Sequence, residues 1–288
     1  MQLRIAVPSK GRLRGPALKL LEAAGIEPLY GDGESRALLV PTTREDVRLV
    51  FLRAEDIPGV VASGAVDLGI TGYDYVVESG ARVVEEADLG FGRARLVLAV
   101  PRSLDIGSVD QLPSGVRIAT KYVNIAARYV EERGIEAEIL RISGASEAMP
   151  SLGAADAVID VVSTGTTLRL HGLKPIDTVL ETSARLIRSP AARDTGDTLE
   201  EVVETVRSVV RARRLKLVLM NVPDESLRSV VEALPAMEGP TIARLESPRP
   251  AWEVITAVPI EALSRVILEA KRRGARDIVV LNVEKVVP

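Results

Sequence analysis

The chain has 288 residues, of which 47% are hydrophobic and 27% charged, and its formal net charge at pH 7 is -3. This balance is typical of a globular protein and lacks the strong positive charge of a nucleic-acid-binding domain, so we expect no nucleic-acid partner. Cysteine is absent and His171 is the one histidine, which excludes disulfides, thiolate catalysis and zinc sites built from Cys or several His. A hard cation bound by oxygen atoms is not excluded.

The N-terminal residues lead directly into a strand pattern, without the apolar segment and cleavage site of a signal peptide. No apolar run reaches about 18 residues, the length that a membrane-spanning helix needs. We therefore expect a cytoplasmic protein with no membrane partner.

The first part of the chain alternates strand and helix patterns. The predicted strands cover residues 3–7, 47–52 and 67–71. Residues 11–24 predict a helix with an apolar stripe at Leu18, Leu21 and Ala24. A second helix begins near Ile57, with Asp56 as its N-cap. This order indicates a parallel sheet with helices on its faces.

The same alternation predicts a second α/β lobe. Its expected strands are residues 96–100, 116–120, 137–142 and 157–162. Residues 124–133 form an amphipathic helix that ends at Gly134. Residues 184–188 predict a strand that returns to the first lobe, and a helix over residues 198–214 follows.

The last 73 residues have a different rhythm. The predicted strands cover residues 216–222, 241–245, 252–258 and 277–283, and the helices cover residues 224–234 and 260–273. The order β-α-β-β-α-β is that of the ferredoxin-like split unit. We therefore predict one lobe from residues 1–92 with 180–214, a second from residues 93–179, and a third domain from residues 215–288.

Residues 156–168 carry the clearest local signal for chemistry. A buried strand that contains Asp160 runs into a turn of small hydroxylated residues around Gly165, and a helix begins near Thr167. Phosphate binds well to such a turn, because free backbone N–H groups point outward and glycine permits close approach. The other interpretation is an ordinary turn with a helix N-cap, and no Gly-Lys-Ser/Thr ending marks it as a P-loop.

This segment resembles the phosphoribosyl pyrophosphate loop of the ATP phosphoribosyltransferases. Five further stretches resemble motifs of that family in the same order: residues 10–13 (KGRL), 52–58 (LRAEDIP), 66–72 (VDLGITG), 117–122 (RIATKY) and 143–147 (SGASE). Near the C-terminus, residues 238–242 and 274–278 are similar to the regulatory domain of the long-form enzymes.

The resemblance implies an α/β fold with a two-lobed, periplasmic-binding-protein-like catalytic core and a C-terminal ferredoxin-like (βαββαβ) regulatory domain. It implies an enzyme that uses ATP, phosphoribosyl pyrophosphate and Mg²⁺, catalyses the first step of histidine biosynthesis and is inhibited by histidine. It also implies a homo-oligomer, from dimer to hexamer, with the active site in the cleft between the lobes.

The matching motifs supply the expected site residues. Those expected to be catalytic are Lys10, Arg12 and Asp160. Those expected to bind substrate are Arg53, Asp67, Gly69, Lys121, Asp156, Ser163, Thr164, Gly165, Thr166 and Thr167. Those expected to bind the effector are Asn221 and Thr241. No residue is assigned to the metal.

Several of these residues have a second interpretation. Asp67 is also explained by capping at the start of a strand, and Asp156 by an exposed turn. Arg53 is also explained by a surface ion pair with Glu55 or Asp56. For the whole chain the alternatives are a two-lobed small-molecule binding protein, a catalytically inactive regulatory paralogue, or a different phosphoribosyltransferase.

Overall fold

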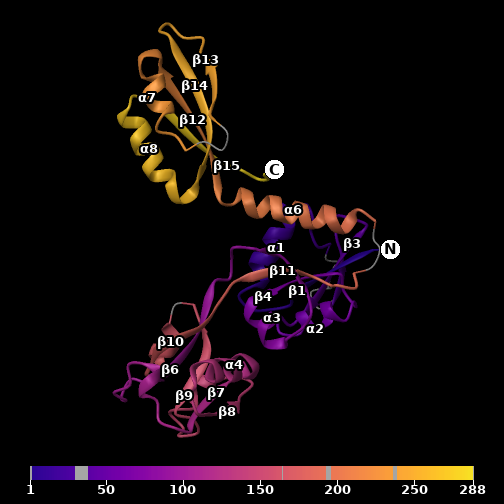
Figure 1. The fold of residues 1–288 in the computed structure, drawn as a ribbon. Coiled ribbons are helices and arrows are strands. Elements are labelled where there is room, and N and C mark those ends of the chain that lie inside the picture. The colour runs from indigo at the N-terminus through magenta and orange to yellow at the C-terminus, as the bar shows by residue number, and fades with distance from the viewer. Residues whose placement is uncertain (1, 30–37, 164, 193–195, 236–238, 288) are drawn as a thin grey trace. The chain divides into compact units, whose positions relative to one another are not determined.

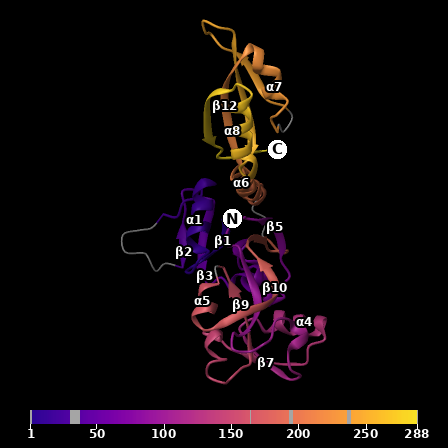
Figure 2. The same cartoon turned by 90° about the vertical axis from the view of Figure 1, so that its left-hand side faces the viewer.

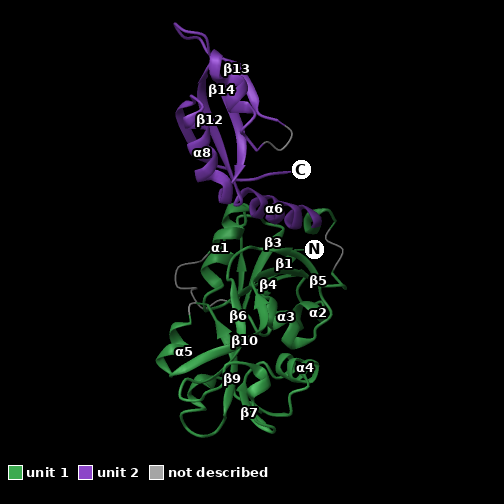
Figure 3. Ribbon diagram, turned by 60° about the vertical axis from the view of Figure 1, so that its left-hand side comes forward, with its two compact units in different colours: residues 1–199 green, residues 200–288 purple. Residues whose placement is uncertain are grey.

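The computed structural model of the chain describes residues 2–29, 38–163, 165–192, 196–235 and 239–287. They form two compact units, residues 1–199 and residues 200–288, which Figure 3 shows in different colours. Unit 1 contains two sheets, each with its own helices, and we call these two parts lobe one and lobe two. None of the described helices is long and apolar enough to span a membrane.

Lobe one is built on a six-stranded sheet with the order β2-β3-β1-β4-β11-β5 (Figure 1). Its strands are β1 (Leu3–Pro8), β2 (Leu39–Pro41), β3 (Val47–Leu52), β4 (Leu68–Gly72), β5 (Val84–Asp88) and β11 (Ala184–Arg188). Its helices are α1 (Arg14–Ala23), α2 (Ile57–Ala62) and α3 (Tyr73–Ser79). β1, β3 and β4 are parallel, whereas β11 runs antiparallel to β4, because it returns from lobe two.

Lobe two is built on a five-stranded sheet with the order β10-β6-β9-β7-β8. Its strands are β6 (Ala94–Pro101), β7 (Val116–Thr120), β8 (Ala137–Arg141), β9 (Ala157–Val162) and β10 (Leu173–Thr182). Its helices are α4 (Val123–Arg133), α5 (Thr166–Leu170) and the short 3-10 turns η1 (Val109–Gln111) and η2 (Ser146–Ala148). α4 and α5 cover opposite faces of the sheet (Figure 2), since they pack into separate apolar clusters.

Unit 2 confirms the predicted β-α-β-β-α-β order. An antiparallel sheet with the order β13-β14-β12-β15 carries two helices on one face. The elements are α6 (Thr198–Ala212), which begins in unit 1, β12 (Leu215–Pro223), η3 (Asp224–Ser226), α7 (Leu227–Val231), β13 (Thr241–Arg244), β14 (Ala251–Pro259), η4 (Ile260–Ala262), α8 (Leu263–Arg272) and β15 (Arg276–Asn282). The α/β class and the two lobes are also confirmed, while the exact domain boundaries stay predictions.

Four helices and strands were missed, apart from the 3-10 turns. β2, α3 and β5 are short, and β10 contains Pro175 and two register shifts in its pairing with β6. Proline is tolerated there because β10 is an edge strand. The breaks in alternation removed the sequence signal for a strand.

Two local predictions need correction. The buried residues of α1 are Ala17, Leu20 and Leu21, whereas Leu18 is half-buried. The helix begins at Arg14, later than predicted, and its buried face includes Ala17, Leu20 and Leu21, so that Leu18 lies at the edge of this face. Asp56 does occupy the N-cap of α2, but its side chain makes no capping hydrogen bond.

Candidate functional site

The candidate site lies at the carboxyl edge of the lobe two sheet. β7, β8 and β9 are parallel and end at the same edge. Because β6 is antiparallel to β9, and β10 to β6, β6 begins and β10 ends at that edge as well. The chain crosses between the lobes just before β6 and just after β10. Open α/β sheets bind ligands at such an edge.

The first cavity at this edge, which we call the loop pocket, is formed where β9 runs into α5. It has a volume of about 90 Å³ and is lined by Glu147, Asp160, Ser163, Gly165, Thr166 and Thr167, with three apolar neighbours. Gly165 has φ +74°, the left-handed conformation, and is the N-cap of α5. The first N–H groups of a helix have no intrahelical partner, so this turn presents donors to the pocket. Thr164, also expected here, lies outside the described residues.

The carboxylate of Asp160 is held by a residue that sequence reasoning did not select. The hydroxyl of Ser146, which is 4% exposed, donates to Oδ2 of Asp160 at 2.6 Å, and the N–H of Val161 donates to Oδ1 at 2.7 Å. Ala145, just before η2, has φ +54°, a conformation that costs a non-glycine residue about 1–2 kcal/mol. Such strain recurs at functional sites and accords with a role for this turn in placing Ser146.

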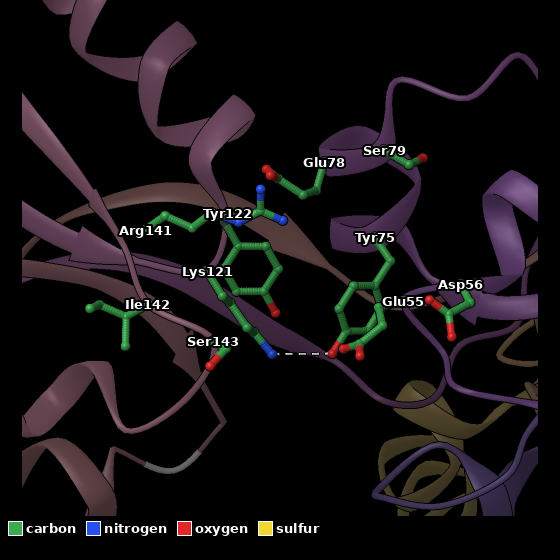
Figure 4. Close-up of a pocket in the computed structure, with 10 residues that line it drawn as sticks. All are labelled: Glu55, Asp56, Tyr75, Glu78, Ser79, Lys121, Tyr122, Arg141, Ile142 and Ser143. Carbon is green, nitrogen blue, oxygen red and sulfur yellow. Dashed lines mark hydrogen bonds between the residues drawn. The ribbon is translucent and has the colours of Figure 1, made fainter.

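The second cavity, the Lys121 pocket, lies between the lobes and has a volume of about 350 Å³. Figure 4 shows Lys121, Arg141 and Ser143 of lobe two facing Tyr75, Glu55 and Asp56 of lobe one. The Nζ of Lys121 donates to the hydroxyl of Tyr75 at 3.2 Å and lies 4.8 Å from the ring centre of Tyr122. The pocket therefore offers an ammonium and a guanidinium group beside aromatic faces.

Buried hydrogen bonds join the lobes next to this pocket. The hydroxyls of Tyr122 and Thr182 each donate to the carboxylate of Asp74 at 2.8 Å. Burial, followed by the charge of Asp74, raises the pKa of Tyr122, so the phenol remains a donor. Glu78 of α3 accepts the N–H groups of Asn124 and Ile125 at the start of α4, where the helix dipole favours a carboxylate.

The third cavity, the Arg95 pocket, is next to the loop pocket and has a volume of about 400 Å³. Its polar lining includes Arg93, Arg95, Ser163, Glu181, Ser183 and Arg185. It shares Val162 and Ser163 with the loop pocket, so the two cavities adjoin. Sequence reasoning missed both Arg93 and Arg95, although they alternate around a buried alanine at the start of a strand.

The structure places two of the expected aspartates at the wrong edge of the sheets. Asp67 precedes β4, is 0% exposed and accepts the N–H of Arg4 at 2.8 Å. Asp156 precedes β9 and forms an ion pair with Arg117 at 2.9 Å. Both lie at the amino ends of their strands, opposite to the pockets. The capping interpretation holds for Asp67 and the ion pair explains Asp156.

Gly69 is also separate from the site. It is buried in β4, and a Cβ atom there would lie 2.6 Å from Ile57 and 2.7 Å from Val61 of α2. Its role is therefore the close packing of helix on strand.

Three basic candidates remain at the carboxyl edge of lobe one. Lys10 and Arg12 are exposed in the segment after β1, and the guanidinium of Arg12 donates to the carbonyl of Gly92 in the crossover before β6. Arg53 is exposed and lies 3.6 Å from Glu55, the surface pair that the sequence offered as its second interpretation.

Unit 2 contains a cavity of its own, the Asn221 pocket, of about 660 Å³. Its polar lining includes Asn221, Asp224, Glu225, Arg249, Arg276 and Asp277. Nδ2 of Asn221 donates to Oδ2 of Asp277 at 3.1 Å. Thr241 is exposed on the edge strand β13 and does not line this pocket.

The part of the chain that the structure describes holds no group of three or more His, Asp or Glu side chains able to enclose a metal ion.

Two family models match the chain. One, described as ATP phosphoribosyltransferase, matches residues 53–208, and the other, described as HisG, C-terminal domain, matches residues 212–285. The range matched by the first model includes every residue that lines the three pockets of unit 1. The range matched by the second includes every residue that lines the Asn221 pocket.

Curated relatives agree over the full chain. The ATP phosphoribosyltransferase of Ignicoccus hospitalis is 52% identical over 286 residues, and that of Metallosphaera sedula is 54% identical over 287 residues. Each match covers 99% of this chain and 100% of the relative. Among solved structures, the ATP phosphoribosyl transferase (HisG:HisZ) complex from Thermotoga maritima matches with a TM-score of 0.64 and 25% identity, over 74% of this chain and 99% of that one.

Proposed function

The chain belongs to the ATP phosphoribosyltransferase family, as its motifs predicted, and from that premise we propose how its cleft performs the first step of histidine biosynthesis. In that reaction N1 of the adenine ring of ATP attacks the anomeric carbon of phosphoribosyl pyrophosphate, and pyrophosphate leaves. N1 carries a free lone pair, so no strong base is needed. The protein must align two substrates and stabilise the charges that develop.

The loop pocket receives the 5′-phosphate of phosphoribosyl pyrophosphate. The observation that carries this proposal is the left-handed Gly165 at the end of β9, which turns the chain so that the amides of α5 and the hydroxyls of Ser163, Thr166 and Thr167 face one small cavity. Thr164 belongs to the same proposed loop. A phosphate bound here places the attached ribose beside Asp160.

Asp160 accepts hydrogen bonds from the ribose hydroxyls. Ser146 and the N–H of Val161 fix its carboxylate in the pocket, which reduces the entropy lost when substrate binds. A fixed carboxylate also favours the positive charge that develops on the ribose as pyrophosphate departs.

The Lys121 pocket receives ATP. Lys121 and Arg141 supply positive charge for its phosphates, and Tyr75 offers an aromatic face. Lys10, Arg12 and Arg53, at the carboxyl edge of lobe one, bind phosphate oxygens of ATP or of the leaving pyrophosphate.

The family uses a metal ion in catalysis, and we propose that the ion is Mg²⁺. Glu147 and Asp160, the two carboxylates of the loop pocket, would hold it together with substrate oxygens. When bound, it supplies positive charge to the leaving pyrophosphate.

Unit 2 is proposed to bind histidine as an inhibitor. The Asn221 pocket presents both carboxylates and guanidinium groups, which suits the ammonium and carboxylate of a free amino acid. We expect Asn221→Ala to weaken inhibition by histidine without changing turnover in its absence. Thr241→Ala tests the second predicted effector residue, whose place outside the pocket leads us to expect unchanged inhibition.

A homo-oligomer, from dimer to hexamer, is part of the same proposal. The face of the unit 2 sheet opposite its helices carries Leu217, Leu219, Ile255, Val279 and Leu281, and Val279 and Leu281 are 49% and 46% exposed. An apolar patch of this kind is typical of an interface. Light scattering during gel filtration would measure the mass. A cytoplasmic location is proposed because ATP is a cytoplasmic metabolite.

The decisive experiment is a spectrophotometric assay of the full chain with ATP, phosphoribosyl pyrophosphate and Mg²⁺. We expect phosphoribosyl-ATP to form, and to form more slowly when histidine is added. Product that is insensitive to histidine would remove the effector proposal alone. The absence of product from folded protein would favour an inactive paralogue.

A further inference from the structure

Two arginines stand at the start of β6, one residue apart, beside the loop pocket. Arg93 and Arg95 are exposed and line the Arg95 pocket, while Ala94 between them is buried. Arg95 pairs directly with Val162 of β9, the residue before Ser163. Its position in the sheet therefore ties it to the segment that begins the phosphate loop.

Arg95 shares a sheet face with the loop pocket. Alternate residues of a strand point to the same side, so Arg95 faces as Val97 and Ala99 do. Those two residues pack in one cluster with Leu168 of α5 and with Val158 and Val162 of β9. Asp160 lies between Val158 and Val162 at the same alternation. Arg95, Asp160 and the start of α5 therefore lie on one face.

Two other charged residues of the Arg95 pocket, Arg185 and Asp88, already have partners within the protein. Arg185 forms ion pairs with Glu85 at 2.6 Å and with Asp88 at 3.0 Å. Asp88 also accepts the N–H of Gly90 and the hydroxyl of Ser183, both at 2.9 Å. Burial raises the pKa of Asp88, but these donors and the charges of Arg185 and Arg93 together hold it below its ordinary value.

Arg95 itself has no ion-pair partner within 4 Å among the described residues, and its cross-strand neighbour Glu181 is exposed. The charge of Arg93 also acts on Asp88, without an ion pair within 4 Å among the described residues. Two guanidinium groups in a concave site suit phosphate recognition, because each planar fork offers two parallel N–H donors to phosphate oxygens. Arg12 reaches the same place, since it donates to the carbonyl of Gly92, next to Arg93.

We propose that Arg93 and Arg95 form the binding site for the diphosphate group of a substrate, next to the 5′-phosphate loop. The inference rests on the proposed function, because it assumes that the loop pocket holds a phosphoribosyl group. Ser163 lines both cavities. When the 5′-phosphate of the ribose is in the loop pocket, the pyrophosphate on the same ribose extends past Ser163 towards the two guanidinium groups. Their charge stabilises the pyrophosphate as it leaves.

Glu181 provides a second test of the proposal, in which the affinity for diphosphate should change in the opposite direction. It pairs with Arg95 across the strands and is a repulsive charge for any bound diphosphate. Neutralising it should therefore tighten diphosphate binding, whereas neutralising either arginine should weaken it. A merely structural role of this strand would not produce opposite changes.

The test uses the full chain with Mg²⁺ and the variants Arg93→Gln, Arg95→Gln and Glu181→Gln. Calorimetry measures the dissociation constant of inorganic pyrophosphate, and the assay measures the KM of each substrate. We expect each arginine variant to weaken pyrophosphate binding by about tenfold or more, as the loss of a charge-assisted hydrogen bond predicts, and Glu181→Gln to strengthen it. Arg128→Gln, an exposed arginine of α4 outside all three pockets, is the matched control.

The two substrates distinguish the source of the diphosphate. A higher KM for phosphoribosyl pyrophosphate assigns the site to its pyrophosphate, and a higher KM for ATP assigns it to the β- and γ-phosphates. Pyrophosphate binding and both KM values equal to those of Arg128→Gln would overturn the proposal. Because calorimetry does not require turnover, an inactive wild-type chain would contradict the proposed function while leaving this site testable.

Discussion

The hydroxyl of Tyr122 donates a 2.8 Å hydrogen bond to Asp74, and both side chains are 1% exposed. Tyr122 is the N-cap residue of α4 in lobe two and Asp74 lies in α3 of lobe one, so this contact joins the lobes. It lies directly behind Lys121, whose ammonium group packs against the ring of Tyr122. The geometry of the cleft and the stability of unit 1 therefore depend on the same buried pair.

Tyr122→Phe removes the donor and leaves the buried carboxylate of Asp74 with one partner fewer. We expect a loss of about 1–3 kcal/mol in the free energy of unfolding, the cost of an unsatisfied buried polar group, measured by urea denaturation. Tyr129→Phe is the matched control, because Asp177, which accepts from Tyr129 at 2.6 Å, keeps its ion pair with Arg133. Equal losses in the two variants would contradict a special role for the lobe contact.

Gly165→Val tests the phosphate loop. A Cβ atom at Gly165 would lie 3.7 Å from its nearest neighbours, an ordinary contact, so the cost comes from the left-handed backbone at φ +74°. We expect the loop to rearrange and the KM for phosphoribosyl pyrophosphate to rise about tenfold or more, as lost hydrogen bonds to a charged group imply. Gly153→Val carries the same backbone strain at φ +70° with open space around it, and should leave that KM unchanged. Wild-type affinity in Gly165→Val would refute the assignment of the loop.

Asp156→Asn separates structure from function at the start of β9. Hydrogen bonds from Arg117 hold the pKa of Asp156 below its ordinary value of 3.8. A depressed folded-state pKa contributes stability that is present above the unfolded value and is lost as the pH falls through the folded one. The pair is about two-fifths exposed, so we expect a difference from wild type of under about 1 kcal/mol at pH 7. This difference should shrink as the pH falls below about 3.8 and disappear below the folded-state pKa of Asp156. A raised KM for either substrate would indicate that Asp156 contributes to substrate binding.

Gly69→Ala tests the packing of α2 on β4. The new methyl group would overlap Ile57 and Val61, and we expect overpacking to cost about 1–3 kcal/mol of unfolding free energy with KM values unchanged in the folded enzyme. Gly59→Ala in α2 itself meets no atom within 4 Å and should stabilise the chain by about 0.5–1 kcal/mol, because alanine favours the helix. Thermal melts of both variants would show opposite shifts, and a changed KM in Gly69→Ala would indicate contact with substrate.

The sequence by itself determined that the residues of the proposed phosphate loop lie together. Asp160, Ser163, Gly165, Thr166 and Thr167 lie within eight residues of one another, so a strand, a left-handed turn and a helix start suffice to gather them in one cavity. The family motifs and the β-α-β-β-α-β order of unit 2 were equally readable, since both depend on local patterns along the chain.

The tertiary structure alone decided which charged residues face that cavity. Asp67 and Asp160 both lie in or beside strands. Asp67 is at the amino edge of its sheet, whereas Asp160 is near the carboxyl edge and lines the loop pocket. The direction of each strand therefore decides whether its aspartate faces a pocket. The Lys121 and Arg95 pockets combine residues that are far apart in the chain. The Arg95 pocket includes the end of β10, an edge strand that the sequence pattern did not predict because of its proline and its register shifts. Such sites form because strand pairing brings distant ends to one edge, and pairing depends on the whole sheet rather than on any single segment.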